Sequence, residues 1–261
     1  MNEQNNYLVS IITPVFNCER FIEQTIKCVQ NQTYTNWELL LVDDCSPDNS
    51  ASIIKELAKT DSRIKYFKLD ENSGAAVARS YALEKSQGRF IAYLDADDVW
   101  YKEKIEKQVQ FMIDNKYAFT CTDYKKIDEQ GKTLKRVVKI PKRVNYNLYL
   151  RNTIIQTVGV MVDTGITGKD VLKMPNIRRR QDAATWCQIL RAGYDCYEVP
   201  ETLSCYRVVK DSLSSNKFKA VKGVWRLYRD IEKLPLLKAS YSFVGYAFHA
   251  VLKRIYLNKE N

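Results

Sequence analysis

The sequence predicts an α/β fold: a central, mostly parallel mixed sheet flanked by helices, with further helices at the C-terminal end. Over residues 1–115, apolar β-branched runs of strand length alternate four times with segments whose apolar residues recur at helical spacing. Such alternation is typical of a parallel sheet covered by helices. Of the 261 residues, 45% are apolar and 28% charged, and Gly and Pro number only 9 and 6, which excludes a collagen-like or low-complexity chain.

The first half of the chain contains four predicted strand–helix pairs. The segment YLVSIITPVFN begins with a strand that is broken at Pro14, and an amphipathic helix over 19–32 follows, with Asn17 as its N-cap. The next elements are a strand over 37–44, a helix within 45–59, a strand and loop over 64–74, a helix over 75–88, a strand over 89–95 and a helix over 102–115. Gly88 stands where the end of a helix favours glycine.

The second half is less regular. A strand and a polar turn at Gly131 are predicted over 118–132, and residues 132–180 are basic and irregular apart from a strand within 152–162. A helix is predicted over 181–193, and a short pair of extended segments over 194–208. From about Phe218 the pattern indicates two helices broken near Pro235. Their apolar stretch ASYSFVGYAFHAVL is shorter than the roughly 20 residues that a membrane-spanning helix needs.

Charge and the rarer residue types narrow the chemistry. The seven cysteines are scattered without a CxxC pair, and the N-terminus lacks the basic and apolar regions of a signal, so we expect reduced thiols and a cytoplasmic location. His249 is the one histidine, which favours a carboxylate as any general base and oxygen ligands for any metal, such as Mg²⁺, Mn²⁺ or Ca²⁺. The net charge is +10, and residues 207–261 carry +8 of it, with twelve Lys/Arg against four Asp/Glu.

Aspartates cluster where two predicted strands end. Asp43 and Asp44 end the second strand, and Asp95, Asp97 and Asp98 end the fourth. Ligands of open parallel sheets bind at the carboxyl ends of the strands, so these side chains are placed to meet a ligand or a metal. The chain has neither GxGxxG nor a P-loop, which leaves a metal bridge through the DAD triplet as a way to hold a nucleotide phosphate. An acidic triplet alone is also typical of a solvated surface.

Four segments of the chain resemble the family 2 glycosyltransferases, which have the GT-A (Rossmann-like) fold. They are VSIITPVFNCERFIEQTIKCVQNQTYTNWELLLVDDCSPDNS, NSGAAVARSYALEKSQGRFIAYLDADD, RRQDAATWCQILRAG and VPETLSCYRVVKDSLSSNK. They follow one another in the family's order and at its spacing, from residue 8 to about residue 217. This resemblance is much more specific than an isolated DxD triplet.

The resemblance implies roles for individual residues. Asp182 takes the place of the family's general base. Asp97, with Asp95, takes the place of the metal-binding DxD motif, which implies Mn²⁺ or Mg²⁺ as the cofactor. The residues implied to contact the nucleotide-sugar are Pro14, Val15, Phe16, Asp44, Asn72, Arg79, Asp95 and Ala96.

The residues by themselves leave simpler roles open. Arg79 suits a solvated helix position or a pair with Glu84. Asp44 suits the cap of the following helix, and Asp182 lies where the dipole of a helix favours an acidic residue without any catalysis. Asp98 has no assigned function beyond a possible cap of the next helix.

Two residues depart from the family pattern. Gln181 replaces the glutamate of the Glu-Asp pair that contains the base, and Val209 stands where many members have a histidine near the metal. We therefore expect the metal to rely on Asp97, the diphosphate and water. The QxxRW motif of processive synthases is absent, so we expect transfer of a single sugar per encounter.

The activity that the resemblance implies is inverting transfer of a sugar from a nucleotide-diphospho-sugar, expected to be a UDP-sugar, to a hydroxyl group. The acceptor would be a glycan or a polyprenyl-linked glycan in bacterial capsule, O-antigen or related polysaccharide synthesis. One alternative is a sugar-nucleotide nucleotidyltransferase, although TPVFNCER lacks the glycine of the usual phosphate loop. Another is a non-catalytic protein that binds nucleotides or polyanions. No motif indicates specific nucleic-acid recognition.

We expect three parts with different roles. Residues 1–115 form the nucleotide-sugar-binding half, residues 116–217 the acceptor-binding and catalytic half of the same domain, and residues 218–261 basic amphipathic helices. Basic and aromatic residues on the last helices favour peripheral contact with the inner face of the cell membrane. The alternative is that these helices pack on the catalytic domain and shield it.

Overall fold

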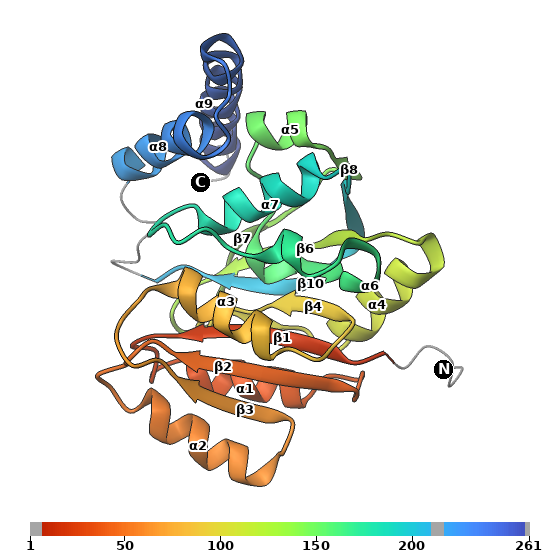
Figure 1. Ribbon diagram of the computed structural model, residues 1–261, viewed down its shortest axis with the longest axis vertical. Coiled ribbons are helices and arrows are strands. Elements are labelled where there is room, and N and C mark those ends of the chain that lie inside the picture. The colour runs from red at the N-terminus through yellow and green to blue at the C-terminus, as the bar shows by residue number, and fades with distance from the viewer. Residues whose placement is uncertain (1–6, 210–216, 259–261) are drawn as a thin grey trace.

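The structure is a computed structural model and describes residues 7–209 and 217–258. The described residues form a ten-stranded mixed sheet with α3 in front of it and α1 behind it (Figure 1). The strands are β1 Val9–Val15, β2 Trp37–Asp43, β3 Ile64–Lys68, β4 Phe90–Tyr93, β5 Val99–Trp100, β6 Phe119–Ile127, β7 Thr133–Val138, β8 Arg143–Val144, β9 Val160–Asp163 and β10 Cys196–Arg207.

The α-helices are distributed along the whole chain. They are α1 Ile22–Gln30, α2 Ser50–Thr60, α3 Ala75–Lys85, α4 Lys104–Asn115, α5 Tyr146–Arg151, α6 Thr164–Thr167, α7 Gln181–Arg191, α8 Lys217–Arg226 and α9 Leu236–Asn258. Three short helical segments of other types connect them: η2 Thr157–Gly159, η3 Asp170–Leu172 and the π-helical η4 Leu227–Ile231.

The sheet order β3-β2-β1-β4-β9-β6-β10-β5 places the carboxyl ends of six strands at one edge. β1 pairs in parallel with β2 and β4, and β2 with β3. β9 lies antiparallel between β4 and β6, and β6 pairs in parallel with β10. β6 and β10 therefore point in the same direction as β1 to β4, towards the left of Figure 1. Loops that follow these six strands meet at that edge.

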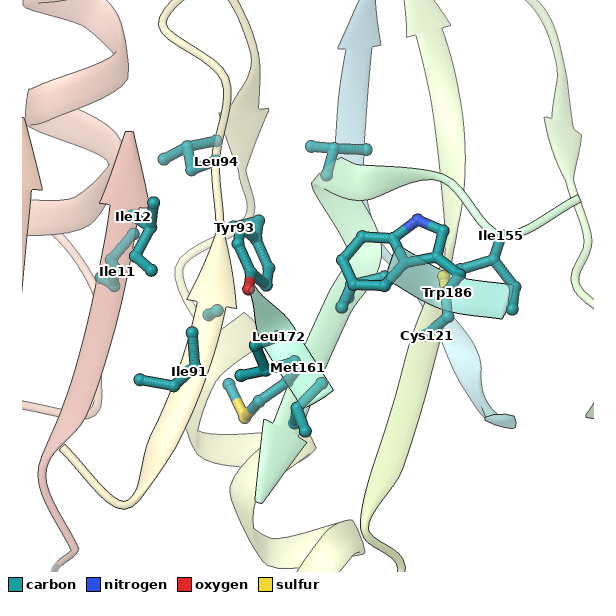
Figure 2. Close-up of a cluster of buried hydrophobic side chains, with 14 of the residues drawn as sticks. Ile11, Ile12, Ile91, Tyr93, Leu94, Cys121, Ile155, Met161, Leu172 and Trp186 are labelled. Atoms are coloured by element: carbon teal, nitrogen blue, oxygen red, sulfur yellow. The ribbon is translucent and has the colours of Figure 1, made fainter. Parts of the chain in front are cut away.

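The predicted α/β architecture with a mostly parallel first half is confirmed, and one buried core runs through both halves. Figure 2 shows Ile11 of β1, Ile91 and Tyr93 of β4, and Trp186 of α7 in this cluster. The rings of Tyr93 and Trp186 pack edge to face with centroids 5.4 Å apart, a preferred geometry for aromatic pairs. Through Trp186 the helix that begins at Gln181 is anchored in the core of the sheet.

The second half is more regular than its sequence suggests. Residues 132–180, predicted to be irregular apart from one strand, also contain β7, β8 and α5. The segment 194–208, predicted as two extended pieces, contains the single strand β10. Its register against β6 shifts between Val199 and Thr202, because Pro200 lacks the N–H that an uninterrupted ladder requires. The predicted pair of extended segments is therefore one interrupted strand.

The start of α1 also differs from the prediction. Its N-cap is Phe21 and not Asn17. Asn17 has φ +51° and its backbone N–H donates to Ser46 Oγ (3.2 Å), in the loop that follows β2. Asparagine tolerates this left-handed conformation better than most residues. Asn17 therefore belongs to the loop at the carboxyl edge of the sheet and precedes the helix.

The C-terminal helices pack against the second half of the molecule and α9 begins directly after Pro235, as predicted. Val224, Leu227 and Tyr228 are fully buried. The Tyr228 hydroxyl donates to the backbone oxygen of Leu150 at the end of α5. Over residues 7–209 and 217–258, no helix combines the length and the apolar character needed to cross a bilayer.

Candidate active site

The loops after β1 and β2 form the first wall of the candidate site. The last residue of β1, Val15, is buried and its backbone oxygen accepts from the Asp44 N–H (2.9 Å), while Pro14 pairs in register with Val42. Phe16 follows with its side chain 52% exposed. An exposed aromatic ring at a strand end offers an apolar face to a ligand. The backbone of this loop is therefore held in place by its pairing with the loop after β2.

Asp44 organises the start of α3. Its carboxylate accepts hydrogen bonds from the backbone N–H groups of Ser73 (2.6 Å) and Gly74 (2.8 Å), and its backbone oxygen accepts from Asn72 Nδ2 (3.0 Å). Asp44 therefore does not cap the helix that follows it, as considered from the sequence. It satisfies free N–H groups at the N-terminus of α3, where a negative charge is favoured, and it brings Asn72 to the same edge.

Arg79 of α3 is buried next to the DxD loop. It is 6% exposed, and Nη2 donates to Asp95 Oδ1 at 2.5 Å. Both simpler readings of Arg79, as a solvated residue or as the partner of Glu84, are thus wrong. Burial acts to lower its pKa, but the carboxylates of Asp95 and Asp182 outweigh burial and raise it. Among the residues that the structure describes, Nε and Nη1 of Arg79 have no hydrogen-bond partner.

Asp97 is a half-buried carboxylate in a negative environment. Burial, reinforced by the charge of Asp95, raises the pKa of Asp97 to about 6, and Arg207 and Arg79 offset only part of this effect. Ala96, between the two aspartates, is held by the Thr25 hydroxyl, which donates to its backbone oxygen (3.0 Å). The DxD loop is therefore fixed through its backbone, while the positive charge near Asp97 compensates only part of the charge on its carboxylate.

Asp98 does not cap the next helix. It is buried, and Oδ1 accepts from the backbone N–H of Arg207 at 2.7 Å. Burial, with the charges of Asp97 and Asp95, raises the pKa of Asp98 well above its usual range. The N-cap of α4 is Glu103. Asp98 consequently joins the loop after β4 to the end of β10.

Arg207 is a residue of this site that the sequence analysis did not single out. Its guanidinium donates to the backbone oxygens of Asp97 (2.6 Å), Asp128 (3.0 Å) and Glu129 (3.2 Å), and to Gln24 Oε1 (2.7 Å). The guanidinium thereby ties the DxD loop to the turn after β6 and to α1. Its partners lie 78 to 183 positions away in the chain, so no local pattern marks its function.

Asp182 lies in the first turn of α7. Arg180, the residue that precedes the helix, has φ +65°, and this sharp turn directs the chain into α7. The Thr157 hydroxyl of η2 donates to Asp182 Oδ2 over 3.4 Å, a long contact. Asp182 also acts on the pKa of Arg79, so the two side chains lie within electrostatic reach of each other. The structure thus brings the predicted base and the predicted phosphate ligand to one place.

Gln181, which replaces the acidic neighbour of the base in the family pattern, is part of α7. Its Oε1 is buried and, within the described chain, has no hydrogen-bond partner. A buried acceptor without a donor is costly, which makes it a position where a ligand hydroxyl would be favoured.

The residues present fit a hard divalent cation. Carboxylate oxygens are the ligands that Mg²⁺ and Mn²⁺ prefer, and Asp97 is short of positive charge. A cation at Asp95 and Asp97 would supply that charge. Over residues 7–209 and 217–258, no cluster of three or more His, Cys, Asp or Glu side chains is arranged to hold a metal. Further ligands would therefore have to come from a bound diphosphate and water.

Comparison with known sequences identifies relatives over nearly the whole chain. Residues 10–169 match the sequence profile of "Glycosyl transferase family 2". TuaG of Bacillus subtilis, a glycosyltransferase named for teichuronic acid biosynthesis, is 46% identical over 248 residues, which cover 95% of this chain and 98% of TuaG. WfgD of Escherichia coli, a UDP-Glc:alpha-D-GlcNAc-diphosphoundecaprenol beta-1,3-glucosyltransferase, is 36% identical over 258 residues and 94% and 96% of the two chains.

Solved structures share the fold at low sequence identity. TarS of S. aureus (residues 1–349, in complex with UDP-GlcNAc) superimposes with a TM-score of 0.70 at 15% identity, over 92% of this chain and 71% of that one. The mannosyltransferase PcManGT of Pyrobaculum calidifontis, solved with GDP-Man and Mn²⁺, gives a TM-score of 0.67 at 17% identity, over 97% and 81%. The GT-A fold is thereby confirmed, and together with the sequence relatives these matches show that the chain belongs to glycosyl transferase family 2.

Proposed function

We propose that this chain is an inverting glycosyltransferase that moves one sugar from a UDP-sugar to a hydroxyl group of a lipid-linked glycan during bacterial surface-polysaccharide synthesis. The observation that carries the proposal is the position of Arg79, which is buried, paired with the DxD residue Asp95 and within electrostatic reach of the candidate base Asp182. A buried cation beside a metal-type motif, with a carboxylate at a helix start within its electrostatic reach, suits a diphosphate leaving group near a proton acceptor.

The first half of the chain, residues 1–115, is proposed to hold the nucleotide-sugar. TPVF and Asp44 would bind the nucleoside, and Asn72 and Arg79 the ribose and diphosphate. The N–H groups of Arg79 that lack a protein partner would donate to diphosphate oxygens, which removes the cost of leaving them unpaired. A bound Mn²⁺ or Mg²⁺, held by Asp97 and Asp95, would neutralise charge on the diphosphate.

The second half, residues 116–217, is proposed to bind the acceptor and to carry the base. Asp182 takes the proton from the acceptor hydroxyl while the hydroxyl oxygen forms a bond to the anomeric carbon. The bond from that carbon to the diphosphate oxygen breaks, and its electron pair leaves with the nucleoside diphosphate. The charge that appears on this oxygen is stabilised by Arg79. A single displacement inverts the anomeric carbon, and the chain needs no nucleophile of its own.

The relatives support the substrate classes. WfgD uses UDP-Glc and an acceptor linked to diphosphoundecaprenol, and it covers 94% of this chain. A lipid-linked acceptor lies in a membrane, so we propose that the enzyme acts at the cytoplasmic face and contacts the bilayer through the C-terminal helices, residues 218–261. The excess of basic residues in that part of the chain supports such a contact.

The test is a set of substitutions assayed for release of nucleoside diphosphate and for sugar transfer. Asp182→Asn should lower kcat by a factor of about 10²–10⁴ and leave intact the rise in melting temperature caused by UDP-sugar with Mn²⁺. Asp97→Ala should lose both the sugar transfer and the rise in melting temperature. Asp114→Asn, an exposed position on α4, is the matched control. Full activity in Asp182→Asn would remove the base assignment, and release of pyrophosphate would indicate a nucleotidyltransferase.

A further inference from the structure

α9 presents an apolar stripe to solvent. Five of its residues are between 55% and 87% exposed: Leu237, Tyr241, Val244, Phe248 and Val251. Their spacing of four, three, four and three residues places them on one face of the helix, over about 21 Å of its length. Exposed apolar patches of this kind are typical of surfaces that contact another protein or a membrane.

The orientation of this stripe is fixed by the opposite face of α9. Ala239 and Ser242 are buried, and the rings of Phe243 and Trp225 pack edge to face at 5.4 Å. At Gly245 the helix is so close to α5 that an added Cβ would lie 2.9 Å from a side-chain carbon of Arg151. The helix cannot turn its stripe inward without breaking these contacts, so in this fold the apolar face is directed outward.

A buried carboxylate ties the segment that leads into α9 to α5 and α7. The side chain of Glu232 is 2% exposed, and it accepts hydrogen bonds from Arg191 of α7 (2.8 Å) and from the Tyr146 hydroxyl of α5 (2.5 Å). Loss of these donors would leave the buried carboxylate of Glu232 without a partner, which is unfavourable. The segment before α9 is therefore held against α5 and α7 of the catalytic half.

The charges around the stripe decide what covers it. Residues 217–258 contain nine Lys or Arg and two acidic residues, and α9 has no acidic residue. Both acidic residues are paired, Glu232 with Arg191 and Asp230 with Arg226. Lys222, Lys233 and Lys238 are exposed. A second copy of the chain would bring two basic surfaces together with no acidic residues along the seam, whereas an anionic bilayer complements this surface.

We propose that the outward face of α9 inserts into the headgroup region of an anionic lipid bilayer, with the basic residues beside it contacting lipid phosphates. Aromatic and aliphatic side chains on one face of a helix, flanked by lysine and arginine, are what interfacial helices use. This deepens the membrane contact of the proposed function by naming the surface that makes it.

The same helix links the bilayer to the candidate base. On its inner face the Tyr246 hydroxyl accepts from Arg180 Nη2 (3.3 Å), and Gly223 of α8 lies against the Arg180 side chain. Arg180 is the residue whose left-handed backbone starts α7, two positions before Asp182. In Figure 1, α9 stands at the end of the molecule farthest from α2. A bilayer at α9 would therefore lie on the side of the catalytic half, where a lipid-linked hydroxyl has to arrive.

The experiment is co-sedimentation of the full chain with vesicles of phosphatidylcholine alone and of phosphatidylcholine with 30% phosphatidylglycerol. The natural chain should bind the anionic vesicles, and added salt should weaken the binding. The double variant Val244→Ser/Phe248→Ser should bind at least about tenfold more weakly. The matched control is Leu134→Ser/Ile166→Ser, which removes two exposed apolar side chains elsewhere on the molecule and should bind like the natural chain.

Two further measurements separate the outcomes. The melting temperature, with and without UDP-sugar and Mn²⁺, shows that the Val244→Ser/Phe248→Ser variant is folded. Light scattering gives the oligomeric state of each protein. Absence of vesicle binding by the natural chain, equal losses in both double variants, or a dimer that only the α9 variant disrupts would each overturn the proposal. Vesicle binding is measured without sugar transfer, so its failure is distinguishable from failure of the proposed activity.

Discussion

Replacing Lys104 by methionine is expected to stabilise the protein. Lys104 lies on α4 and is 0% exposed, and within the described residues its Nζ has no hydrogen-bond partner. Burial lowers the pKa of this ammonium from 10.5 to about 7, and the nearby Cys121 and Cys28 counteract only part of the effect. Nζ lies 3.6 Å from the centroid of the Trp100 ring, a contact that favours the charged form.

The magnitude follows from the two protonation equilibria. Below pH 7 Lys104 is protonated in both the folded and the unfolded chain. Burial of the ammonium then lowers the free energy of unfolding by a constant amount of about 5 kcal/mol, at 1.36 kcal/mol per pKa unit. Between pH 7 and 10.5 the folded chain is neutral and the unfolded chain charged, so the cost falls as the pH rises. At pH 7.5 it is about 4 kcal/mol, and imperfect packing of the methionine side chain offsets up to about 1.5 kcal/mol of this gain. Lys104→Met should therefore raise the free energy of unfolding by about 2–3 kcal/mol.

Guanidinium-induced unfolding at pH 7.5 and 8.5 measures both parts of this argument. Between these pH values the natural chain should gain about 1 kcal/mol of stability relative to Lys104→Met. Only in the natural chain does a buried lysine have a lower pKa in the folded state than in the unfolded state. Lys107→Met, on the same helix but with a side chain 43% exposed, is the matched control and should change stability by less than about 0.5 kcal/mol. A less stable Lys104→Met variant, or one with the same pH dependence as the natural chain, would refute the reasoning.

Three further substitutions test the site. Arg207→Lys should lower the free energy of unfolding by about 2–3 kcal/mol, because lysine cannot bond all the carbonyl oxygens that Arg207 holds. It should also reduce the rise in melting temperature caused by UDP-sugar with Mn²⁺. An unchanged rise would contradict a positioning role of Arg207. Cys45→Gly should raise the free energy of unfolding by about 0.5–1 kcal/mol, because glycine adopts the φ of +60° at this position without strain. A lower Tm of this variant in calorimetry would contradict the prediction. Gly159→Ala should cost about 1–3 kcal/mol by chemical denaturation, because its Cβ would lie 2.9 Å from the backbone oxygen of Thr122; unaltered stability would disprove this.

The strands and helices of the first 115 residues were predictable because their signals are local. The strands β1, β2 and β4 are short buried runs, and the helices α1, α2 and α4 show an apolar face at helical spacing, so neighbouring residues are enough to recognise them. The same signals place Asp44 and Asp95 at strand ends, and parallel strands present those ends at one edge. The acidic edge was thus visible without coordinates.

The second half was less predictable because its elements depend on distant neighbours. β10 continues past Pro200 because β6 supplies a long parallel partner on the other side of the interruption. Short elements such as β8 and α5 carry too few residues for a period to show, and packing against the rest of the fold stabilises them. Their existence is a property of the assembled sheet.

The sequence by itself determined the fold class, the family and the motifs that supply carboxylates to the site, since these reside in short contiguous patterns. Only the tertiary structure decided how those carboxylates are bonded: Asp95 to the buried Arg79, and Asp98 to Arg207, 109 positions away. It also decided which face of α9 points to solvent, because that depends on what α5 and α8 cover. Ion pairing and burial are set by residues that meet only after folding, and no local pattern encodes them.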